Sequence, residues 1–471
     1  MKTLVTIMLL VLVPRPSAAQ ELKSPWDPFL DTLQARTIGW FLDATPRSSG
    51  LTPDRQPRGE AIRGKPAASP SSIAAVGFAL TTYPIAAERR LISRSEAADR
   101  ALTTLRFLWS LPQDSKSPSD KTGTNVAGYR GFFYHFIDTK TGLRAWDCEL
   151  STIDTGLLIA GVLFCQSYFD RLTAPEREIR ALADSLYRRI DWRWAMGDTT
   201  GIWMGWKPEE GWSQLTWYGY NEAMIVYILA LGSPTHAVPP SVWEHWTAPY
   251  VWAEHYGQEY LNFAPLFGHQ YSHAWIDFRG IRDPYMRARG IDYFENSRRA
   301  TYANRVYAME NPGQWRDYSD SIWGLTACDG PGDTTFAVDG RTRRFHSYSA
   351  RGSSSTWSND DGTIAPAAAG GSLPFAPEIC IPALKAMRSK YGDRLWTKHG
   401  FLDAFNPSFI TPQTPNGWFD HDYLGIDQGP IVLMTENLRN GFVWKVMSRN
   451  RYIVDGLKKA GFTGGWLDGA K

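Results

Sequence analysis

Apolar residues recur at the spacing of an amphipathic helix along most of the chain. Several of these segments open with Ser, Thr, Asp or Pro, which favour helix starts. The predicted helices are Pro28–Leu42, Ser71–Ala87, Ser95–Trp109, Leu150–Phe169, Pro175–Arg189, Asn221–Leu231, Tyr285–Glu310, Ala376–Tyr391 and Gly429–Ser448. Strand patterns are short and sparse, and they predict small hairpin pieces at Phe132–Asp138 and Phe345–Ser349. The pattern therefore indicates an all-α fold with minor β-hairpins.

Long loops rich in aromatic residues, Gly and Asp separate the predicted helices. Residues with candidate chemistry lie in these loops or at helix starts. Many paired helices arranged in this way suggest an antiparallel helical ring, the (α/α)6 toroid or barrel. A two-domain helical bundle is the alternative architecture, and no short internal repeat is visible.

The chain divides into a leader and one body. Residues 1–19 have the pattern of a signal peptide, with Lys2 at the positive start, Leu4–Val13 as the apolar core and Ala19 at a small-residue cleavage site. The apolar run is too short to span a bilayer, so we expect export to the periplasm or medium without membrane insertion. Residues 20–471 exceed the usual single-domain length, yet no long linker divides them. We predict one domain, with the Ser-, Gly- and Ala-rich segment Gly352–Gly371 as an internal loop.

Aromatic residues make up 14% of the 471 residues, with 21 Trp, 21 Tyr and 22 Phe. This is more Trp than core packing usually demands, and the flat faces of Trp and Tyr suit the CH-rich faces of sugar rings. The formal net charge of +2, from 50 basic and 48 acidic residues, gives no reason to expect nucleic acid or an anionic membrane as a partner. Composition therefore favours a carbohydrate site, with about half of the aromatic residues expected in the core.

The four cysteines are too few and too scattered for a disulfide framework or a CxxC metal site. Cys165 ends an apolar run and is predicted to be a buried thiol. A single bridge between Cys148 and Cys328 remains open, as does the state of Cys380.

Glu222 lies between a cluster of aromatic residues and an apolar run, in the segment Trp217–Tyr227. Desolvation favours the neutral form of a carboxyl group and raises its pKa, which suits a general acid that protonates a leaving group near neutral pH. The alternative is a glutamate at a helix start that faces water and is favoured by the helix dipole.

Six motifs occur in one order: Glu149-Leu-Ser-Thr-Ile-Asp154-Thr-Gly, Tyr220-Asn-Glu222-Ala-Met, Asp277-Phe-Arg279-Gly, Asp292-Tyr-Phe-Glu295-Asn-Ser, Trp323-Gly-Leu-Thr-Ala-Cys328-Asp329-Gly-Pro and Gly425-Ile-Asp427-Gln-Gly-Pro430. Together they resemble the bacterial glucoamylase-like proteins, specifically glycoside hydrolase family 144, from about Leu30 to about Gly461. The characterised members are largely endo-β-1,2-glucanases. The resemblance implies an (α/α)6 barrel, inverting hydrolysis and no catalytic metal.

Inverting hydrolysis needs one carboxyl group that protonates the glycosidic oxygen and one that activates water on the opposite face. The resemblance and the local sequence both nominate Glu222 as the acid. For the base we favour Asp427, on a predicted turn before an apolar helix whose start would keep it ionised, although an N-cap aspartate also fits that position. Asp154 and Glu149 are expected on a helix start that lines the same cavity, where either could position water or hold sugar hydroxyls. Because they are five positions apart and do not share a helix face, we expect only one of them, Asp154, to point inward. Asp147 is a further candidate in the preceding loop.

The remaining candidates would bind sugar. Arg279 is a possible sugar-hydroxyl donor within a segment of acidic and basic residues that we otherwise expect to form ion pairs. The candidate aromatic and imidazole groups are Trp217, Tyr220, His273, Trp275, Trp323, Trp418 and Tyr134. No metal site, cofactor, nucleophile elbow, phosphate loop or dinucleotide motif is expected.

The sequence therefore predicts an exported, monomeric, inverting β-glucan hydrolase, most consistent with an endo-β-1,2-glucanase that releases short sophorooligosaccharides. Endo or exo action stays open. A polysaccharide lyase on the same helical toroid is one alternative, although near-neutral charge and abundant carboxylates count against it. A glycan-binding protein without turnover is the other.

Overall fold

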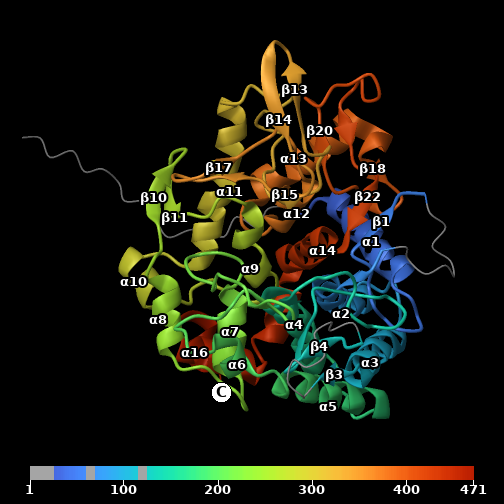
Figure 1. Cartoon of the computed structure of the whole chain (residues 1–471), viewed down its shortest axis with the longest axis vertical. Helices are drawn as coiled ribbons and strands as arrows, with labels where there is room; N and C mark the ends of the chain where they lie inside the picture. The colour runs from blue at the N-terminus through green and yellow to red at the C-terminus, as the bar shows by residue number, and fades with distance from the viewer. Residues whose placement is uncertain (1–25, 60–68, 115–124, 471) are drawn as a thin grey trace, which may run out of the picture.

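The computed structural model describes residues 26–59, 69–114 and 125–470, and helices form most of its regular structure (Figure 1). The helices are α1 (Pro28–Ala44), α2 (Ile73–Glu88), α3 (Arg94–Ser110), α4 (Thr152–Tyr168), α5 (Ala174–Arg188), α6 (Trp192–Met196), α7 (Met224–Gly232), α8 (Ser241–Thr247), α9 (Tyr271–Trp275), α10 (Pro284–Arg289), α11 (Tyr293–Glu310), α12 (Pro366–Gly371), α13 (Pro377–Tyr391), α14 (Gly425–Asn440), α15 (Phe442–Met447) and α16 (Arg451–Lys459). The predicted signal peptide lies outside the described residues.

The strands are short and pair locally or across helix starts. Antiparallel pairs join β1 (Arg55–Pro57) to β22 (Asp422–Leu424), β2 (Ser71–Ser72) to β6 (Phe136–Ile137), β10 (Trp252–His255) to β11 (Gln258–Leu261), β12 (Ala327–Cys328) to β15 (Ser349–Ala350), β13 (Thr334–Val338) to β14 (Arg341–Phe345), β16 (Gly352–Ser353) to β17 (Ser358–Asn359), β18 (Trp396–Thr397) to β19 (Gly400–Phe401) and β20 (Phe405–Asn406) to β21 (Trp418–Phe419). Two three-stranded sheets have the orders β3 (Gln113–Asp114), β4 (Gly128–Tyr129), β5 (Phe132–Phe133) and β7 (Leu150–Ser151), β8 (Gly205–Lys207), β9 (Gly211–Trp212). The prediction of a mostly helical fold with small hairpins is confirmed.

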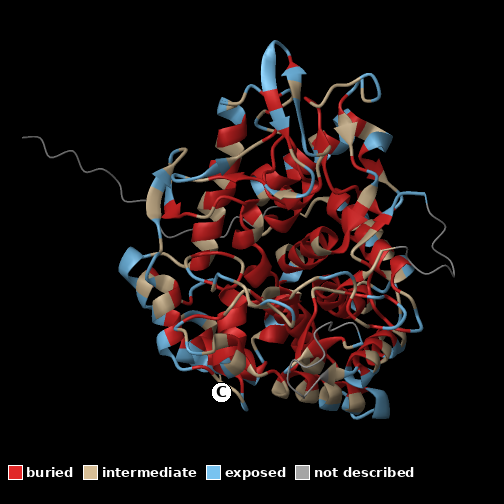
Figure 2. Ribbon diagram, viewed as in Figure 1, coloured by how far each residue is buried: buried red, intermediate tan, exposed pale blue. Residues whose placement is uncertain are grey.

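Helix α2 lies at the centre of the packing because it is apolar on every side. All of its residues from Ile73 to Ala86 are buried, and it packs against both α4 and α14. The crossing with α4 depends on two glycines: a Cβ on Gly77 would lie 2.3 Å from a backbone oxygen of α4, and a Cβ on Gly161 would lie 2.1 Å from the carbonyl oxygen of Gly77. Figure 2 shows the buried residues filling the middle of the molecule, whereas the β13–β14 hairpin projects from it with mostly exposed residues.

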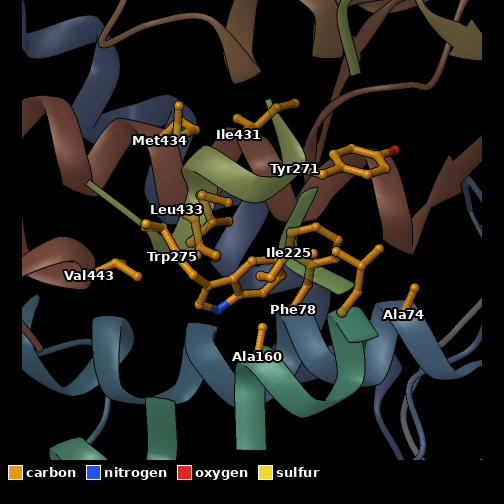
Figure 3. Close-up of a cluster of buried hydrophobic side chains, with 14 of the residues drawn as sticks. Ala74, Phe78, Ala160, Ile225, Tyr271, Trp275, Ile431, Leu433, Met434 and Val443 are labelled. Carbon is orange, nitrogen blue, oxygen red and sulfur yellow. The ribbon is translucent and has the colours of Figure 1, made fainter. Parts of the chain in front are cut away.

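Aromatic and aliphatic side chains from several helices meet beside α2 (Figure 3). The Phe78 ring of α2 stacks on Trp275 of α9 at a centroid distance of 4.8 Å and meets the edge of Tyr271 at 6.0 Å. Ile431 and Leu433 bring α14 to the same cluster. This packing fixes the starts of α4, α7 and α14 relative to one another.

Two predicted helices are each divided at a left-handed glycine. The segment predicted as one helix, Tyr285–Glu310, is two helices. The first, α10, ends at its C-cap Gly290, which has a φ of 74°, and the second, α11, begins after its N-cap Asp292. The segment predicted as Gly429–Ser448 begins earlier, at Gly425, and is interrupted at Gly441, with φ 68°. Glycine adopts positive φ without a Cβ clash, which explains both breaks.

Three inner helices begin directly after a short strand. Strand β2 precedes α2, β7 precedes α4, and β22 precedes α14. Backbone bonds tie these starts to other segments: the Ile73 amide donates to the His135 carbonyl at 3.2 Å, and the Gly425 amide donates to the Asp54 carbonyl at 2.7 Å. The segment that contains His135 is thereby held at the start of α2, and the segment that contains Asp54 is held at the start of α14.

All four cysteines, each within the described residues, are free thiols. Cys165 is buried as predicted, and no bridge joins Cys148 to Cys328. Within the described ranges, the helices include none that combines the length and apolar character needed to cross a membrane.

Candidate active site

Glu222 lies in the turn that leads into α7, and its carboxyl group is poorly solvated. Its Oε2 is buried and has no hydrogen-bond partner, while its backbone carbonyl accepts a bond from the Ser272 hydroxyl at 3.1 Å. Burial, together with the negative charge of Asp154, raises the pKa of Glu222 to about 7. A carboxyl group in this state can donate a proton near neutral pH.

Asp154 and Glu149 both converge on His135. The His135 ring approaches Glu149 Oε1 through Nδ1 at 2.8 Å and Asp154 Oδ1 through Nε2 at 3.5 Å. Burial alone would lower the pKa of His135, but Asp154, Glu149 and Asp54 raise it to about 9, so the ring is an imidazolium at neutral pH. We call His135, Glu149, Asp154 and Glu222 the histidine cluster.

The expectation that only one of Asp154 and Glu149 points inward is wrong. Glu149 precedes strand β7, whereas Asp154 lies in the first turn of α4, where the N-cap Ser151 donates to its carboxylate at 2.5 Å. Helical spacing therefore does not apply to this pair, and both carboxylates contact the same ring, Glu149 from before β7 and Asp154 from the first turn of α4.

Asp427 lies in the first turn of α14 and is 3% exposed. Leu424 is the N-cap, so the N-cap alternative for Asp427 is wrong. The expectation that the helix start keeps Asp427 ionised is wrong as well. Its Oδ2 has no donor, and burial with the charges of Asp329 and Asp54 raises its pKa to about 7, despite a hydrogen bond with Asp403.

Asp427 belongs to a group of carboxylates around a single arginine. Arg55 is 2.5 Å from Asp329, 3.1 Å from Asp54 and 3.7 Å from Asp422. Oxygens of Asp329, Asp403 and Asp420 lie within 4.8 Å of one another. We call this group the aspartate cluster, and its members are Arg55, Asp54, Asp329, Asp403, Asp420, Asp422 and Asp427. Such crowding does not by itself define a metal site, and Arg55 already binds Asp329.

The two clusters are coupled through their charges. The negative charge of Asp54, in the aspartate cluster, contributes to the raised pKa of His135. Burial and the negative charges of nearby groups, including Asp427, Glu222 and Asp154, raise the pKa of Tyr271, at the start of α9, well above its ordinary value. Glu222 and Asp427 are therefore both near enough to Tyr271 for their charges to affect its ionisation.

Trp418 lines a cavity of about 290 Å³ whose wall also includes Arg394, Phe419 and Asp420. The ring is half-buried, on strand β21. Since Asp420 is a member of the aspartate cluster, the cavity adjoins the candidate site. Trp418 is thus placed where a bound sugar could reach it.

Trp217 and Tyr220 lie on the segment that leads to Glu222, but they are largely covered. The Trp217 indole donates to Thr152 at 2.9 Å, and the Tyr220 ring stacks on Tyr293 at 5.8 Å. Both rings position the turn that holds Glu222.

Four predicted sugar-binding residues are core residues instead. Tyr134, His273, Trp275 and Trp323 are each 1% exposed or less. Trp275 donates to Thr81 at 2.9 Å within the α2 cluster, and His273 contacts Ser297 at 3.1 Å. A ring with no exposed face has no surface for a sugar, so these four predictions are corrected.

Arg279 forms the ion pairing expected of its segment, and the role of Asp147 stays a prediction. Arg279 forms an ion pair with Asp277 at 2.7 Å, and its guanidinium lies 4.4 Å from the centre of the Trp444 ring. It belongs to the ion-paired scaffold. Asp147 is exposed, next to Trp146, which has a left-handed φ of 55°.

Sequence reasoning missed several site residues. His135 lies inside the predicted strand segment Phe132–Asp138, where the alternation of apolar residues concealed it. Asp403 comes from a loop 24 residues before Asp427, and Asp420 from the loop that leads into β22. The acid-rich run Asp420-His421-Asp422, shortly before Asp427, is a signal that could have been followed.

The Glycoamylase family, described as "Putative glucoamylase", matches residues 214–451. The chain is also similar to the "Exo beta-1,2-glucooligosaccharide sophorohydrolase (non-reducing end)" of Parabacteroides distasonis, with 26% identity over 464 residues. That match covers 91% of this chain and 57% of the relative, so the chain spans little more than half of the relative's length.

Solved structures extend the likeness to the fold. A "putative glucoamylase" from Bacteroides uniformis superposes with a TM-score of 0.78 and 30% identity, over 96% of this chain and 100% of that one. An endo-beta-1,2-glucanase from Chitinophaga pinensis, in complex with sophorotriose and glucose, has a TM-score of 0.78 and 27% identity, over 93% of this chain and 98% of that one. The family match covers Glu222 and Asp427 and the structural matches cover nearly the whole chain, so this chain belongs to the Glycoamylase family.

Proposed function

We propose that the protein is a glycoside hydrolase that cleaves β-1,2-glucan with inversion of the anomeric carbon. The observation that supports this most is the pairing, in one site, of Glu222 with Asp427. Each has a buried oxygen without a donor, and the pKa of each is raised to about 7. The linkage comes from the relatives, whose names specify β-1,2-glucans.

In the proposed reaction Glu222 donates its proton to the glycosidic oxygen as the bond from that oxygen to the anomeric carbon breaks. A water molecule adds its oxygen to the anomeric carbon from the opposite face and loses one proton to Asp427. Proton exchange with solvent then recharges Glu222 and clears Asp427. Near neutral pH the shared value of about 7 leaves a fraction of molecules with Glu222 protonated and Asp427 ionised.

The histidine cluster supports the acid in this scheme. His135 offsets part of the negative charge of Asp154 and Glu149, so these carboxylates can accept hydrogen bonds from sugar hydroxyls with less negative charge beside Glu222. Asp154 and Glu149 are therefore proposed as substrate-positioning groups.

Purified protein should be incubated with β-1,2-, β-1,3-, β-1,4- and α-1,4-glucans, and the products separated by chromatography. Cleavage confined to β-1,2-glucan is the expected result. A ladder of short sophorooligosaccharides indicates the endo action that we propose, as in the Chitinophaga pinensis protein. Sophorose alone from the start indicates exo action, as in the Parabacteroides distasonis relative.

The same incubation, with a polyuronate added to the panel, tests the other two classes. A lyase would form unsaturated products that absorb in the ultraviolet, but its uronate substrates are anionic and would be repelled by the aspartate cluster. A glycan-binding protein would retain glucan without forming products. Either outcome would reject the hydrolase assignment.

Inversion has its own test. A single displacement on a β-linked glucan releases α-configured reducing ends first, and proton NMR within the first minutes records them before mutarotation. Initial β-anomer would indicate a covalent intermediate and carboxyl groups only about 5–5.5 Å apart.

We further propose that the helices close into an (α/α)6 ring of one domain, with the site at the starts of the inner helices α4, α7 and α14. Export through the predicted leader is part of the same proposal, since a glucan polymer is met outside the cytoplasm. Fractionation of cells that express the full chain would locate the protein.

A further inference from the structure

Asp403 is the most enclosed member of the aspartate cluster. It lies between β19 and β20 and is 1% exposed. Its Oδ2 accepts a bond from the Asp329 amide at 2.8 Å, whereas its Oδ1 is buried without a donor. No cation contacts it among the described residues, because Arg55 reaches Asp329, Asp54 and Asp422 instead.

The side chain of Asp403 is a hydrogen-bond neighbour of Asp427. Two carboxylates are both acceptors, so such a contact requires that one of them holds a proton. Asp427 Oδ2 is, like Asp403 Oδ1, buried without any other donor. One proton between the two side chains satisfies both oxygens and removes one charge from the cluster.

We propose, on the basis of the proposed hydrolase function, that Asp403 is a positioning residue that retains this proton and donates it to Asp427. Asp427 then stays ionised with one oxygen held by the Asp403 hydroxyl. Its other oxygen is left to take the proton of the attacking water. Asp403 keeps its own proton throughout, so the reaction requires no additional proton donor or acceptor.

The charges around Asp403 favour this distribution. Burial and the negative charges of Asp427 and Asp329 raise the pKa of Asp403 well above its ordinary value. Asp420, whose pKa is raised to about 8 by burial and by Asp403 and Asp329, adds to the effect. The groups facing Asp427 itself are Asp329, Asp54 and Arg55, with the hydroxyls of Tyr271 and Tyr348 nearby. Arg55 thus acts on Asp427 through charge, while Asp403 acts through a hydrogen bond.

The test compares the pH dependence of kcat/KM on β-1,2-glucan for wild type, Asp403→Ala and Asp403→Asn. Loss of the donor in Asp403→Ala should move the acidic limb upward by about one pH unit, because a hydrogen bond to the ionised form of Asp427 is lost. The amide of Asp403→Asn still donates and should keep the limb within a few tenths of a unit of wild type. KM should change little in either variant.

A downward shift of the limb in both variants would overturn the proposal, because it would mean that wild-type Asp403 is itself ionised. Asp320→Ala, an exposed acid beside Arg305, is the matched control and should leave the limb in place. Thermal unfolding of each variant shows whether it is folded, and Asp403→Asn keeps the test decisive if the alanine variant is not. Stoichiometric bound divalent cation, with activity lost on chelation, would also overturn the proposal because a cation would then neutralise the cluster.

A measurement without substrate separates this proposal from the hydrolase function. The infrared difference spectrum between wild type and Asp403→Asn at pH 7 should show the carbonyl stretch of one buried protonated carboxylic acid, in addition to the stretches of Glu222 and Asp420 that both proteins share. If this signal is present but no glucan is cleaved, the functional proposal fails and the shared proton stands. If glucan is cleaved and the signal is absent, the role of Asp403 is rejected.

Discussion

The histidine cluster and the aspartate cluster neutralise buried carboxylates in different ways. In the first, the His135 imidazolium lies between Glu149 and Asp154 and offsets part of their negative charge. In the second, Arg55 contacts Asp54, Asp329 and Asp422, and leaves Asp403 and Asp427 without a cation. Protons must compensate there, and the pKa of Asp427 rises to about 7.

This contrast shows that an acid and a base are not distinguished by residue type or by burial alone. Glu222 and Asp427 have similar raised pKa values for different reasons. Glu222 is desolvated next to a compensated cluster, whereas Asp427 is desolvated inside an uncompensated one. The comparison predicts that substitutions on the two sides will fail in distinguishable ways.

The largest effect is expected from removing the proposed acid. Glu222→Gln should lower kcat on β-1,2-glucan by ~10²–10⁴-fold, because the amide preserves shape and cannot supply a proton. Glucan binding should be nearly intact, as measured by calorimetry. Glu295→Gln, which breaks only the ion pair with Arg299 at 2.9 Å, is the control and should be nearly as active as wild type.

A substrate with a good leaving group distinguishes the roles proposed for Glu222 and Asp427. On an aryl β-sophoroside the departing oxygen needs little protonation, so Glu222→Gln should recover much of its rate. Asp427→Asn should remain slow on both substrates by ~10²–10⁴-fold, because water activation is still required. Equal recovery of both variants would mean that the two roles are not divided between these residues.

A smaller effect is expected from His135→Gln. The loss of a charge-assisted contact worth about 1.5–3 kcal/mol predicts a fall in kcat/KM of roughly tenfold to a hundredfold. Asp154 and Glu149 would then add uncompensated charge beside Glu222 and raise its pKa, so the basic limb should move to higher pH.

The pH profile separates this from a folding defect. His236→Gln is the control, since His236 also faces a carboxylate, Asp191 at 3.7 Å, but at the surface. Its basic limb should coincide with that of wild type. An unmoved limb in His135→Gln would show that His135 does not compensate the histidine cluster.

The fold and part of the site could be predicted from sequence. Helical periodicity located most long helices, and the aromatic setting of Glu222 indicated a desolvated acid, in agreement with its buried Oε2. The aspartate cluster could not be found in this way, because Asp54, Asp329, Asp403 and Asp427 meet only through strand pairings such as β1 with β22. The prediction that Trp275 and Trp323 bind sugar was wrong, because both are fully buried. The local sequence around a Trp in the core does not differ from that around a Trp in a binding cleft.

Tyr348 provides a more modest test on the aspartate side. The residue is 49% exposed. Burial around its hydroxyl and the negative charges of Asp427 and Asp403 raise the pKa of Tyr348 well above its ordinary value. Tyr348→Ala should raise KM about fivefold, on the order of 1 kcal/mol for an aromatic face, with kcat nearly unchanged. Tyr348→Phe should retain wild-type KM, and Trp109→Ala, an exposed ring at the end of α3, is the control. A fall in kcat with constant KM would assign Tyr348 a role other than stacking.

The last effect is in stability and leaves catalysis aside, and it has opposite signs for two glutamates of the histidine cluster. The folded pKa of Glu222, about 7, lies above the ordinary 4.5, so the folded protein holds a proton that the unfolded chain releases between these values. Stability therefore falls as pH rises through that window, by up to about 3 kcal/mol. Glu222→Gln should accordingly be more stable than wild type at pH 8 by a few degrees in Tm, and nearly equal at pH 5.

The pKa of Glu149 is lowered, because the hydrogen bond and charge of His135 outweigh burial. Its contribution is present above the unfolded pKa, so Glu149→Gln should be less stable than wild type at pH 8. If both variants shift Tm in the same direction at pH 8, the difference in charge environment between these two glutamates is not the one described.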